Sequence, residues 1–262
     1  MQITPLQYLL AILAGFLAGI INTLAGSGSA VTLPLLVFLG LPANVANGTN
    51  RVGVIVQNIV GIATFARSGK MDLRGGLWLV LPAFLGAAVG AQIAVDLDEQ
   101  AMNRAIGAVM VVMLLLVLLN PKRWLREQSE FQEGRPGLLT LAIFFAIGMY
   151  GGFIQVGVGI FLLTALVMGA GYTLTHANAL KLLIVLVFSF SAIAIFIANG
   201  QVNWPLGLLV AVGQSLGAWA AARFAVSYRD ANLWVRRLLI LVILYSIFRF
   251  LGLQEWLLAS LG

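Results

Sequence analysis

This chain lacks cysteine altogether and carries very little charge. Its 262 residues contain no cysteine, and Asp, Glu, Lys and Arg together account for 9% of them. The absence of thiols excludes disulfides, thiol catalysis and cysteine metal sites. Soluble domains carry roughly 25% charged residues. The low charge, the 61% hydrophobic residues and a mean hydropathy of +1.02 are therefore typical of an integral membrane protein.

The apolar segments are continuous and do not alternate with polar residues. Alternation marks a membrane β-barrel, so the spans are predicted to be helical and the fold all-α. A helix of about 20 apolar residues crosses the roughly 30 Å hydrocarbon core. We expect two short segments near 30–40 and 160–170, too brief to span comfortably, and longer helices near 6–24, 42–66, 75–95, 101–119, 138–155, 173–198, 205–226 and 233–252.

The sequence aligns with itself at an offset of 131 residues. Six glycines of the first half, from Gly26 to Gly86, fall on glycines of the second half, and Asn47 falls on Asn178. Chance would give about one glycine match in these windows. The duplication predicts a first repeat at 1–119 and a second at 138–262, joined by a polar linker at 120–137. Together the two repeats are expected to form one transport domain.

Basic residues orient the two halves. The net charge of +6 fits cytoplasmic loops of a membrane protein better than nucleic-acid binding. With the loop around Arg67, Lys70 and Arg74 in the cytoplasm, an inverted second half places 11 basic residues inside and 2 outside. A parallel second half would move four of those arginines outside. We therefore predict inverted repeats, with both termini outside and the linker inside.

Two glycine breaks form the first candidate site. Gly26-Ser27-Gly28-Ser29 precedes one short segment, and Gly157-Val158-Gly159 precedes the other. Ser27 or Ser29 is expected to cap the first short helix. Backbone N–H groups at a helix start favour anions, and broken helices at a repeat interface are a recurring transporter site. Close helix packing is the alternative, and it is the role expected for glycine pairs such as Gly86 and Gly90.

Two cations form the second candidate site. Arg51 lies nine residues after Pro42, about 13 Å along its helix. The repeat offset places Lys181 opposite Asn50, one position away from Arg51. We therefore expect both near the middle of the membrane. All nine acidic residues map to loops, the linker or the chain end, so neither cation has an internal counter-ion.

The two cations are interpreted as an anion anchor, and snorkelling or a helix-dipole role is the alternative. The candidate substrate-binding residues are Arg51, Lys181, Asn47, Asn50, Asn178, Ser27, Gly28, Ser29, Gly157, Gly159, Gln57 and Gln155.

His176 is the single histidine and opens the helix that carries Lys181. A lone histidine more often makes an interface hydrogen bond than acts as a proton switch, and any proton dependence residing in the protein is assigned to it. We expect no metal site and no cofactor. Ser27 lacks the G-x-S-G order of rhomboid-like enzymes, so an intramembrane hydrolase is disfavoured and the protein is not expected to be an enzyme.

Two segments resemble the duplicated signature of the TauE/SafE sulfite-exporter family: "NTLAGSGSAVTLPLLVFLGLPANVANGTNRV" and "GGFIQVGVGIFLLTALVMGAGYTLTHANALK". The resemblance covers nearly the whole chain. It implies a multi-pass bacterial inner-membrane protein, a secondary transporter or exporter of sulfite, sulfoacetate or another organosulfonate. Its partners would be the anionic solute and membrane lipids.

The family's glycine-rich run appears here with serines at Ser27 and Ser29, so the exact substrate does not carry over. An anion channel is the alternative function. The sequence leaves open the direction of transport, the coupling ion and the choice between monomer and homodimer.

Overall fold

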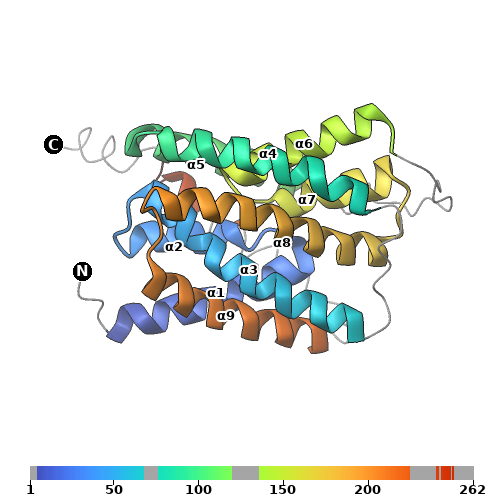
Figure 1. Ribbon diagram of the computed structural model, residues 1–262. Coiled ribbons are helices and arrows are strands. Elements are labelled where there is room, and N and C mark those ends of the chain that lie inside the picture. Colours follow the sequence, from blue (N-terminus) through green and yellow to red (C-terminus); the bar gives the residue numbers. More distant parts are fainter. Residues whose placement is uncertain are drawn as a thin grey trace.

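The computed structural model is a bundle whose helices lie mostly side by side along one direction (Figure 1). It describes residues 5–67, 76–119, 136–224, 240–241, 243–248 and 250. Within these ranges the regular elements are all helical, as predicted. They are α1 (Pro5–Ala25), α2 (Ser29–Phe38), α3 (Ala43–Arg67), α4 (Leu77–Asp96), α5 (Glu99–Leu119), α6 (Leu138–Phe153), α7 (Val158–Thr164), a π-helical turn η2 (Ala165–Gly169), α8 (Leu174–Ala198) and α9 (Trp204–Phe224).

The helix ends agree with the sequence prediction to within a few residues. The predicted linker falls almost entirely outside the described residues, and so does most of the helix predicted at 233–252. Both short segments are present. α2 has 10 residues, about 15 Å of helix, which is half the thickness of a hydrocarbon core.

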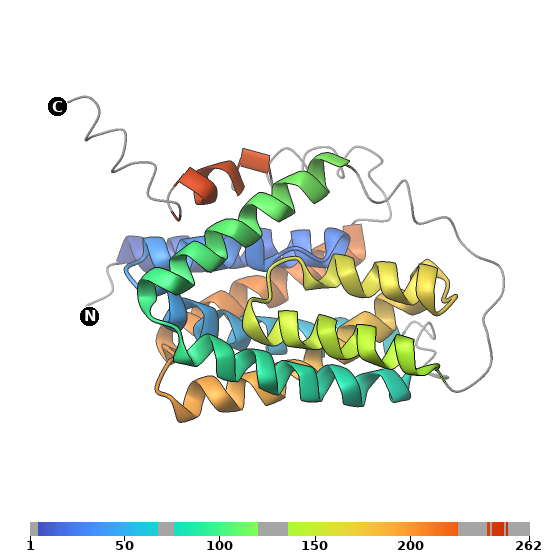
Figure 2. The same ribbon diagram turned by 90° about the horizontal axis from the view of Figure 1, so that it is seen from above.

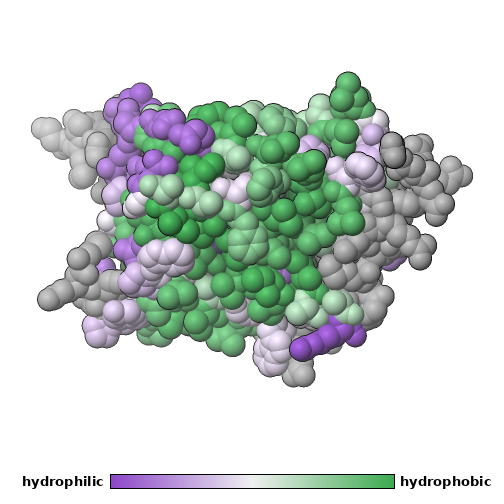
Figure 3. All heavy atoms as spheres, viewed as in Figure 1, coloured by the Kyte–Doolittle hydropathy of each residue, from purple (hydrophilic) through white to green (hydrophobic). Residues whose placement is uncertain are grey.

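The surface is suited to lipid. Five of the described helices, α1, α4, α5, α8 and α9, are long and apolar enough to cross a membrane. Apolar side chains form a broad band around the middle of the molecule in the view of Figure 3, with polar ones toward its ends. Leu81, Leu115 and Leu208, from three different helices, are more than half exposed. A soluble monomer would rarely expose such a surface.

The helices pair reciprocally between the two halves. α1 packs along α9, and α4 packs along α6. The glycines at these contacts admit no side chain: a Cβ on Gly19 would lie 2.2 Å from the carbonyl oxygen of Gln214, and one on Gly90 would lie 1.9 Å from that of Met149. The packing role predicted for Gly86 and Gly90 is confirmed. The same contacts are made by Gly15, Gly213 and Gly217 between α1 and α9, and by Gly86, Gly148 and Gly152 between α4 and α6.

α3 and α8 occupy the middle of the bundle and contact each other. They run in opposite directions, as the colour gradients of the two ribbons show in Figure 1. α3 also packs on α9, and α8 packs on α4. A helix of the first half and its counterpart in the second half therefore form the centre, and each is flanked by helices of both halves.

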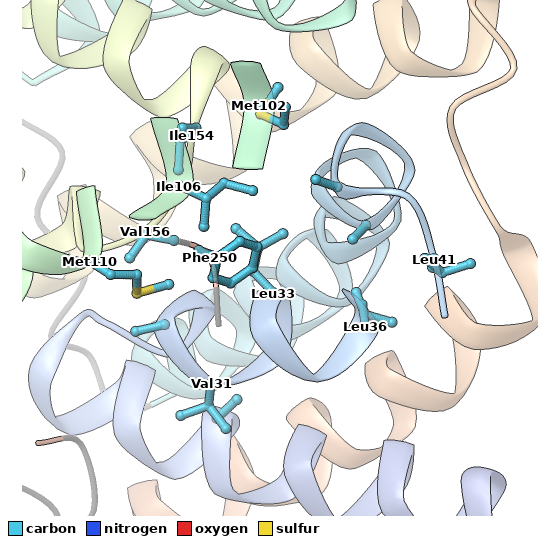
Figure 4. Packing of buried hydrophobic residues seen from close by; sticks show 14 of the residues in the cluster. Val31, Leu33, Leu36, Leu41, Met102, Ile106, Met110, Ile154, Val156 and Phe250 are labelled. Atoms are coloured by element: carbon cyan, nitrogen blue, oxygen red, sulfur yellow. The ribbon is translucent and has the colours of Figure 1, made fainter. Parts of the chain in front are cut away.

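α5 covers the two glycine breaks between helices with apolar side chains. It crosses the other helices obliquely (Figure 2). Its Met102, Ile106 and Met110 pack in one fully buried cluster with Leu33 and Leu36 of α2. Ile154 and Val156, from the break between α6 and α7, join this cluster (Figure 4). The polar residues beneath are thereby separated from one side of the bundle.

Candidate functional site

The polar centre of the protein is one face of α3. Successive helical residues are about 100° apart, so the five polar side chains named at the end of this paragraph fall within roughly 120° of the helix surface. The α3 hydrogen bonds to the end of α6 and to α2 are all made from this face. Each of its polar side chains is at most 2% exposed: Asn47, Asn50, Arg51, Gln57 and Asn58.

Arg51 binds the end of a helix from the other half. It is fully buried, its Nη1 donates to the carbonyl oxygen of Gly151 (3.0 Å) and its Nη2 donates to that of Gly152. Its guanidinium lies 4.8 Å from the centre of the Phe196 ring. Asn47 Nδ2 donates to the next carbonyl, that of Phe153 (2.7 Å). Three successive carbonyls at the C-terminus of α6 are thus bound from α3, where the helix dipole favours a cation.

These carbonyls leave the Arg51 charge without a carboxylate among the described residues. Asp96, Asp98 and Glu99 lie exposed at the turn between α4 and α5. The Arg51 Nε–H has no hydrogen-bond partner although it is buried. Arg51 therefore does have the helix-dipole role at the end of α6, but this role leaves one of the guanidinium's N–H donors without an acceptor.

Asn50 ties α3 to α2. Its Nδ2 donates to Ser29 Oγ (3.0 Å), and its Oδ1 accepts from Thr32 Oγ1. The expectation that Ser27 or Ser29 caps α2 is wrong. Gly28 is the N-cap residue and makes no side-chain cap; it has helical φ and ψ, and its N–H donates to Asn22 Oδ1 (3.4 Å). Ser29 is already the first helical residue, so its hydroxyl points to Asn50 instead.

The two glycine breaks touch each other. A Cβ on Gly159 would lie 2.7 Å from the carbonyl oxygen of Gly26 and 2.9 Å from its Cα. Gly26 and Gly157 both have positive φ, 73° and 72°, which turns the chain sharply at each break. The duplicated motifs thus meet at one point between the halves, beside the end of α6 that Arg51 and Asn47 bind.

Eight buried polar atoms of the described residues have no hydrogen-bond partner in the protein. Native structures contain only a few such atoms per hundred residues, and each calls for an explanation. Most of these lie on the polar face of α3 or at the two breaks. They are Ser27 Oγ, Asn47 Oδ1, Arg51 Nε, Gln57 Oε1, Asn58 Oδ1, Gln155 Oε1, Gln201 Oε1 and Gln214 Oε1.

Lys181 lies elsewhere along the bundle. Its Nζ donates to Asn178 Oδ1 (3.0 Å), and it is 3% exposed. Arg51 lies against Phe196, which is 15 positions after Lys181 on α8, or roughly 20 Å along the helix. The expectation that the two cations share one depth is wrong. Each sits about a third of the way along its own helix, and the two helices run in opposite directions.

The remaining candidates lie near these groups. Gln155, between α6 and α7, donates from Nε2 to Ser189 Oγ (2.9 Å), and Gln57 donates from Nε2 to the carbonyl oxygen of Gly19 (3.4 Å). His176 is half-buried, and its backbone N–H donates to Thr173 Oγ1 at the start of α8.

Sequence reasoning missed Thr32, Asn58, Ser189, Phe196 and Gln214. Asn58 carried a usable signal, because it follows Arg51 by seven residues and so lies on the same helix face.

The bond from Thr32 to Asn50 gives a stability prediction. Thr32→Val keeps the shape of the side chain but leaves the buried Asn50 Oδ1 without a donor. We expect the free energy of unfolding to fall by roughly 1–3 kcal/mol, measured by thermal unfolding in detergent. Thr64→Val is the control, since Thr64 Oγ1 donates only to the Val60 carbonyl of the same helix. Equal stability of both variants would contradict the prediction.

A bundle of apolar helices around a buried polar centre, with an arginine that has no carboxylate partner among the described residues, is typical of membrane transport proteins. Comparison with known proteins gives the same class. The model of the family Sulfite exporter TauE/SafE matches residues 11–250. The chain therefore belongs to the TauE/SafE family, and it is a multi-pass membrane protein.

Curated relatives carry transporter names. "Probable membrane transporter protein ORF9" of Sinorhizobium sp is 28% identical over 222 residues, which cover 84% of each chain. "Probable membrane transporter protein YfcA" of Escherichia coli K12 is 27% identical over 227 residues, covering 86% of this chain and 83% of the relative. A Haemophilus influenzae "Probable membrane transporter protein" is 28% identical over 221 residues, 84% of this chain and 86% of the relative. No solved structure gives a significant match.

Proposed function

We propose that the protein is a secondary transporter of a small oxyanion, sulfite or an organosulfonate such as sulfoacetate, in the bacterial inner membrane. The observation that carries the proposal is Arg51, which is fully buried between the two halves. Among the described residues it has no carboxylate partner, and its Nε–H is unused. An arginine fork suits two oxygens of a sulfonate or sulfite. The family name, which refers to sulfite export, supports the same solute class.

The solute is proposed to bind where Arg51 and Asn47 meet the glycine breaks. Its oxygens take the place of the Gly151 and Gly152 carbonyls as acceptors for the guanidinium. Binding then loosens the tie between α3 and the end of α6. Ser27, Gln155 and the backbone at Gly28, Gly157 and Gly159 line the same junction. Lys181 and Asn178 are assigned to a second position along the path, because of their distance from Arg51.

Alternating access follows from inverted repeats. The opposite directions of α3 and α8 support inversion, and so does the reciprocal pairing of α1 with α9 and α4 with α6. The anion site is made of α3 from one half and the end of α6 from the other, so rocking of the halves opens it to either side in turn.

Sulfite flux into proteoliposomes tests the proposal. We expect flux that saturates with concentration and thermal stabilisation of the detergent-solubilised protein by sulfite. Flux that rises linearly with sulfite concentration indicates a channel instead. The absence of both flux and stabilisation with sulfite, sulfoacetate and taurine would refute this solute class.

Inversion predicts which loops an impermeant thiol reagent reaches. The chain has no cysteine of its own, so single substitutions report cleanly on intact cells. We expect labelling of Asn199→Cys, in the turn after α8, and of Ser260→Cys, while Ser129→Cys in the linker stays unlabelled. The reverse pattern at Ser129 and Asn199 would contradict this topology.

Transport is predicted not to require Na⁺. Among the described residues the three carboxylates lie exposed at one turn, so none is buried where it could hold the ion. Replacing Na⁺ by choline in the proteoliposome assay is expected to leave the flux unchanged. A steep dependence of the flux on Na⁺ concentration would contradict this prediction.

A further inference from the structure

The unpartnered atoms around Arg51 are not all donors. Asn47 Oδ1 is an acceptor, it belongs to a side chain that is 1% exposed, and it has no partner. Its identity as oxygen is fixed, because the other end of the amide bonds the Phe153 carbonyl, which can only accept. Asn47 Oδ1 therefore needs a donor that the described part of the protein does not supply.

Asn47 and Arg51 are neighbours in space. They are four residues apart on α3, one helical turn, and between them they bond three successive carbonyls at the end of α6. The free Arg51 Nε–H and the free Asn47 Oδ1 nevertheless do not bond each other, since the carbonyls hold both side chains in place. The junction thus presents a cationic donor and a neutral acceptor from side chains one helical turn apart.

We infer that this site selects a monoanion that carries its own O–H or N–H group, an inference that rests on the proposed anion site at Arg51. The anionic oxygens bind the guanidinium, and the donor binds Asn47 Oδ1. A fully deprotonated anion has only acceptors, so it would turn a negative oxygen toward that carbonyl-type oxygen. Leaving a buried polar group unpaired is what lets such a site reject analogues strongly.

For sulfite, this selects hydrogensulfite over the dianion. Each anion then carries one proton through the membrane as part of itself, and no carboxylate relay in the protein is needed. The proton is bound before entry and released after exit, so the protein's own charge does not change.

Sulfamate and methanesulfonate test the inference at one pH. Both are monoanions of nearly the same shape, but sulfamate bears an NH₂ donor on sulfur where methanesulfonate bears a methyl group. We expect the wild-type protein, purified in detergent, to bind sulfamate about tenfold or more tightly than methanesulfonate. Equal affinities, with sulfite still bound, overturn this inference and leave the proposed function intact. Failure to bind sulfite, sulfamate and methanesulfonate overturns the proposed function itself.

Two leucine variants locate the acceptor. Asn47→Leu is expected to bring the affinity ratio of sulfamate to methanesulfonate close to one. Asn58→Leu is the matched control: Asn58 lies on the same face of α3, is buried, bonds a backbone carbonyl through Nδ2 and has a free Oδ1. It is 11 residues away, about 16 Å along the helix, so its variant should keep the ratio. A ratio that survives in Asn47→Leu overturns the assignment.

Discussion

Replacing Arg51 by glutamine is expected to weaken sulfite binding by roughly 1.5–3 kcal/mol, the worth of a charge-assisted hydrogen bond. That is about 10- to 150-fold in affinity. The reason is that Arg51 is the cation of the polar centre, fully buried and with donors to spare. Arg51→Lys should be intermediate, because it keeps the charge but loses the planar fork.

Stability must be measured apart from binding in this variant. Arg51→Gln removes a charge from the interior, which favours folding, and loses two bonds to the end of α6, which opposes it. The difference in unfolding temperature with and without sulfite isolates binding. A ligand at 100 times its Kd stabilises by about 2.7 kcal/mol. We expect this ligand-dependent shift in the wild-type protein and little of it in the variant.

Two other cations serve as controls for Arg51. Arg67→Gln changes an exposed arginine at the end of the same helix and should leave sulfite binding unchanged. Lys181→Met should reduce binding less than Arg51→Gln, because Lys181 lies at another level of the bundle. Unchanged sulfite binding in Arg51→Gln would show that Arg51 only caps α6 and that the anion binds elsewhere.

Gly159→Ala is expected to disrupt both folding and transport. The added Cβ would lie 2.7 Å from the Gly26 oxygen and 2.9 Å from the Gly26 Cα. Both atoms are backbone, so no side chain can rotate away, and one of the two breaks must shift. Overpacking of this kind costs about 1–3 kcal/mol. The shift also moves the junction at which Arg51 and Asn47 hold the end of α6.

The control for Gly159 lies in the same short segment. A Cβ on Gly169, at the end of η2, meets nothing within 4 Å, so Gly169→Ala should keep the unfolding temperature and the sulfite flux of the wild type. Wild-type flux and stability in Gly159→Ala would mean that the contact between the breaks is loose in the membrane.

The sequence specified the elements better than their relation in space. The helix ends, and the packing role of glycines spaced four residues apart, follow from local patterns. The structure agrees with both. The cap of α2 could not be predicted, because the backbone angles of Gly28 decide it. The binding of Arg51 to the end of α6 joins residues 100 positions apart, and no local pattern reports which helix end lies opposite which side chain.

The prediction that Arg51 and Lys181 lie at the same depth was wrong for a geometric reason. The repeat offset pairs Asn50 with Lys181, but equivalent positions in oppositely directed helices coincide in depth only at the middle of the two helices. Arg51 lies in the first third of α3, so its counterpart moves to the other side. Asn58, by contrast, was within reach of a periodicity argument applied to the whole of α3.

Contacts between the two halves join residues that the ribosome makes far apart in time. Arg51 is made 100 residues before the carbonyl that binds its Nη1. At about 5–20 residues per second, this amounts to roughly 5–20 s. The interval between synthesis of Gly19 and synthesis of the α9 backbone that it contacts is about twice as long. The nascent first half therefore exists for some time with Arg51 unbound by the end of α6 and with the α1 glycines not yet packed against α9. For that interval, the Arg51 charge has neither the Gly151 nor the Gly152 carbonyl to bind it.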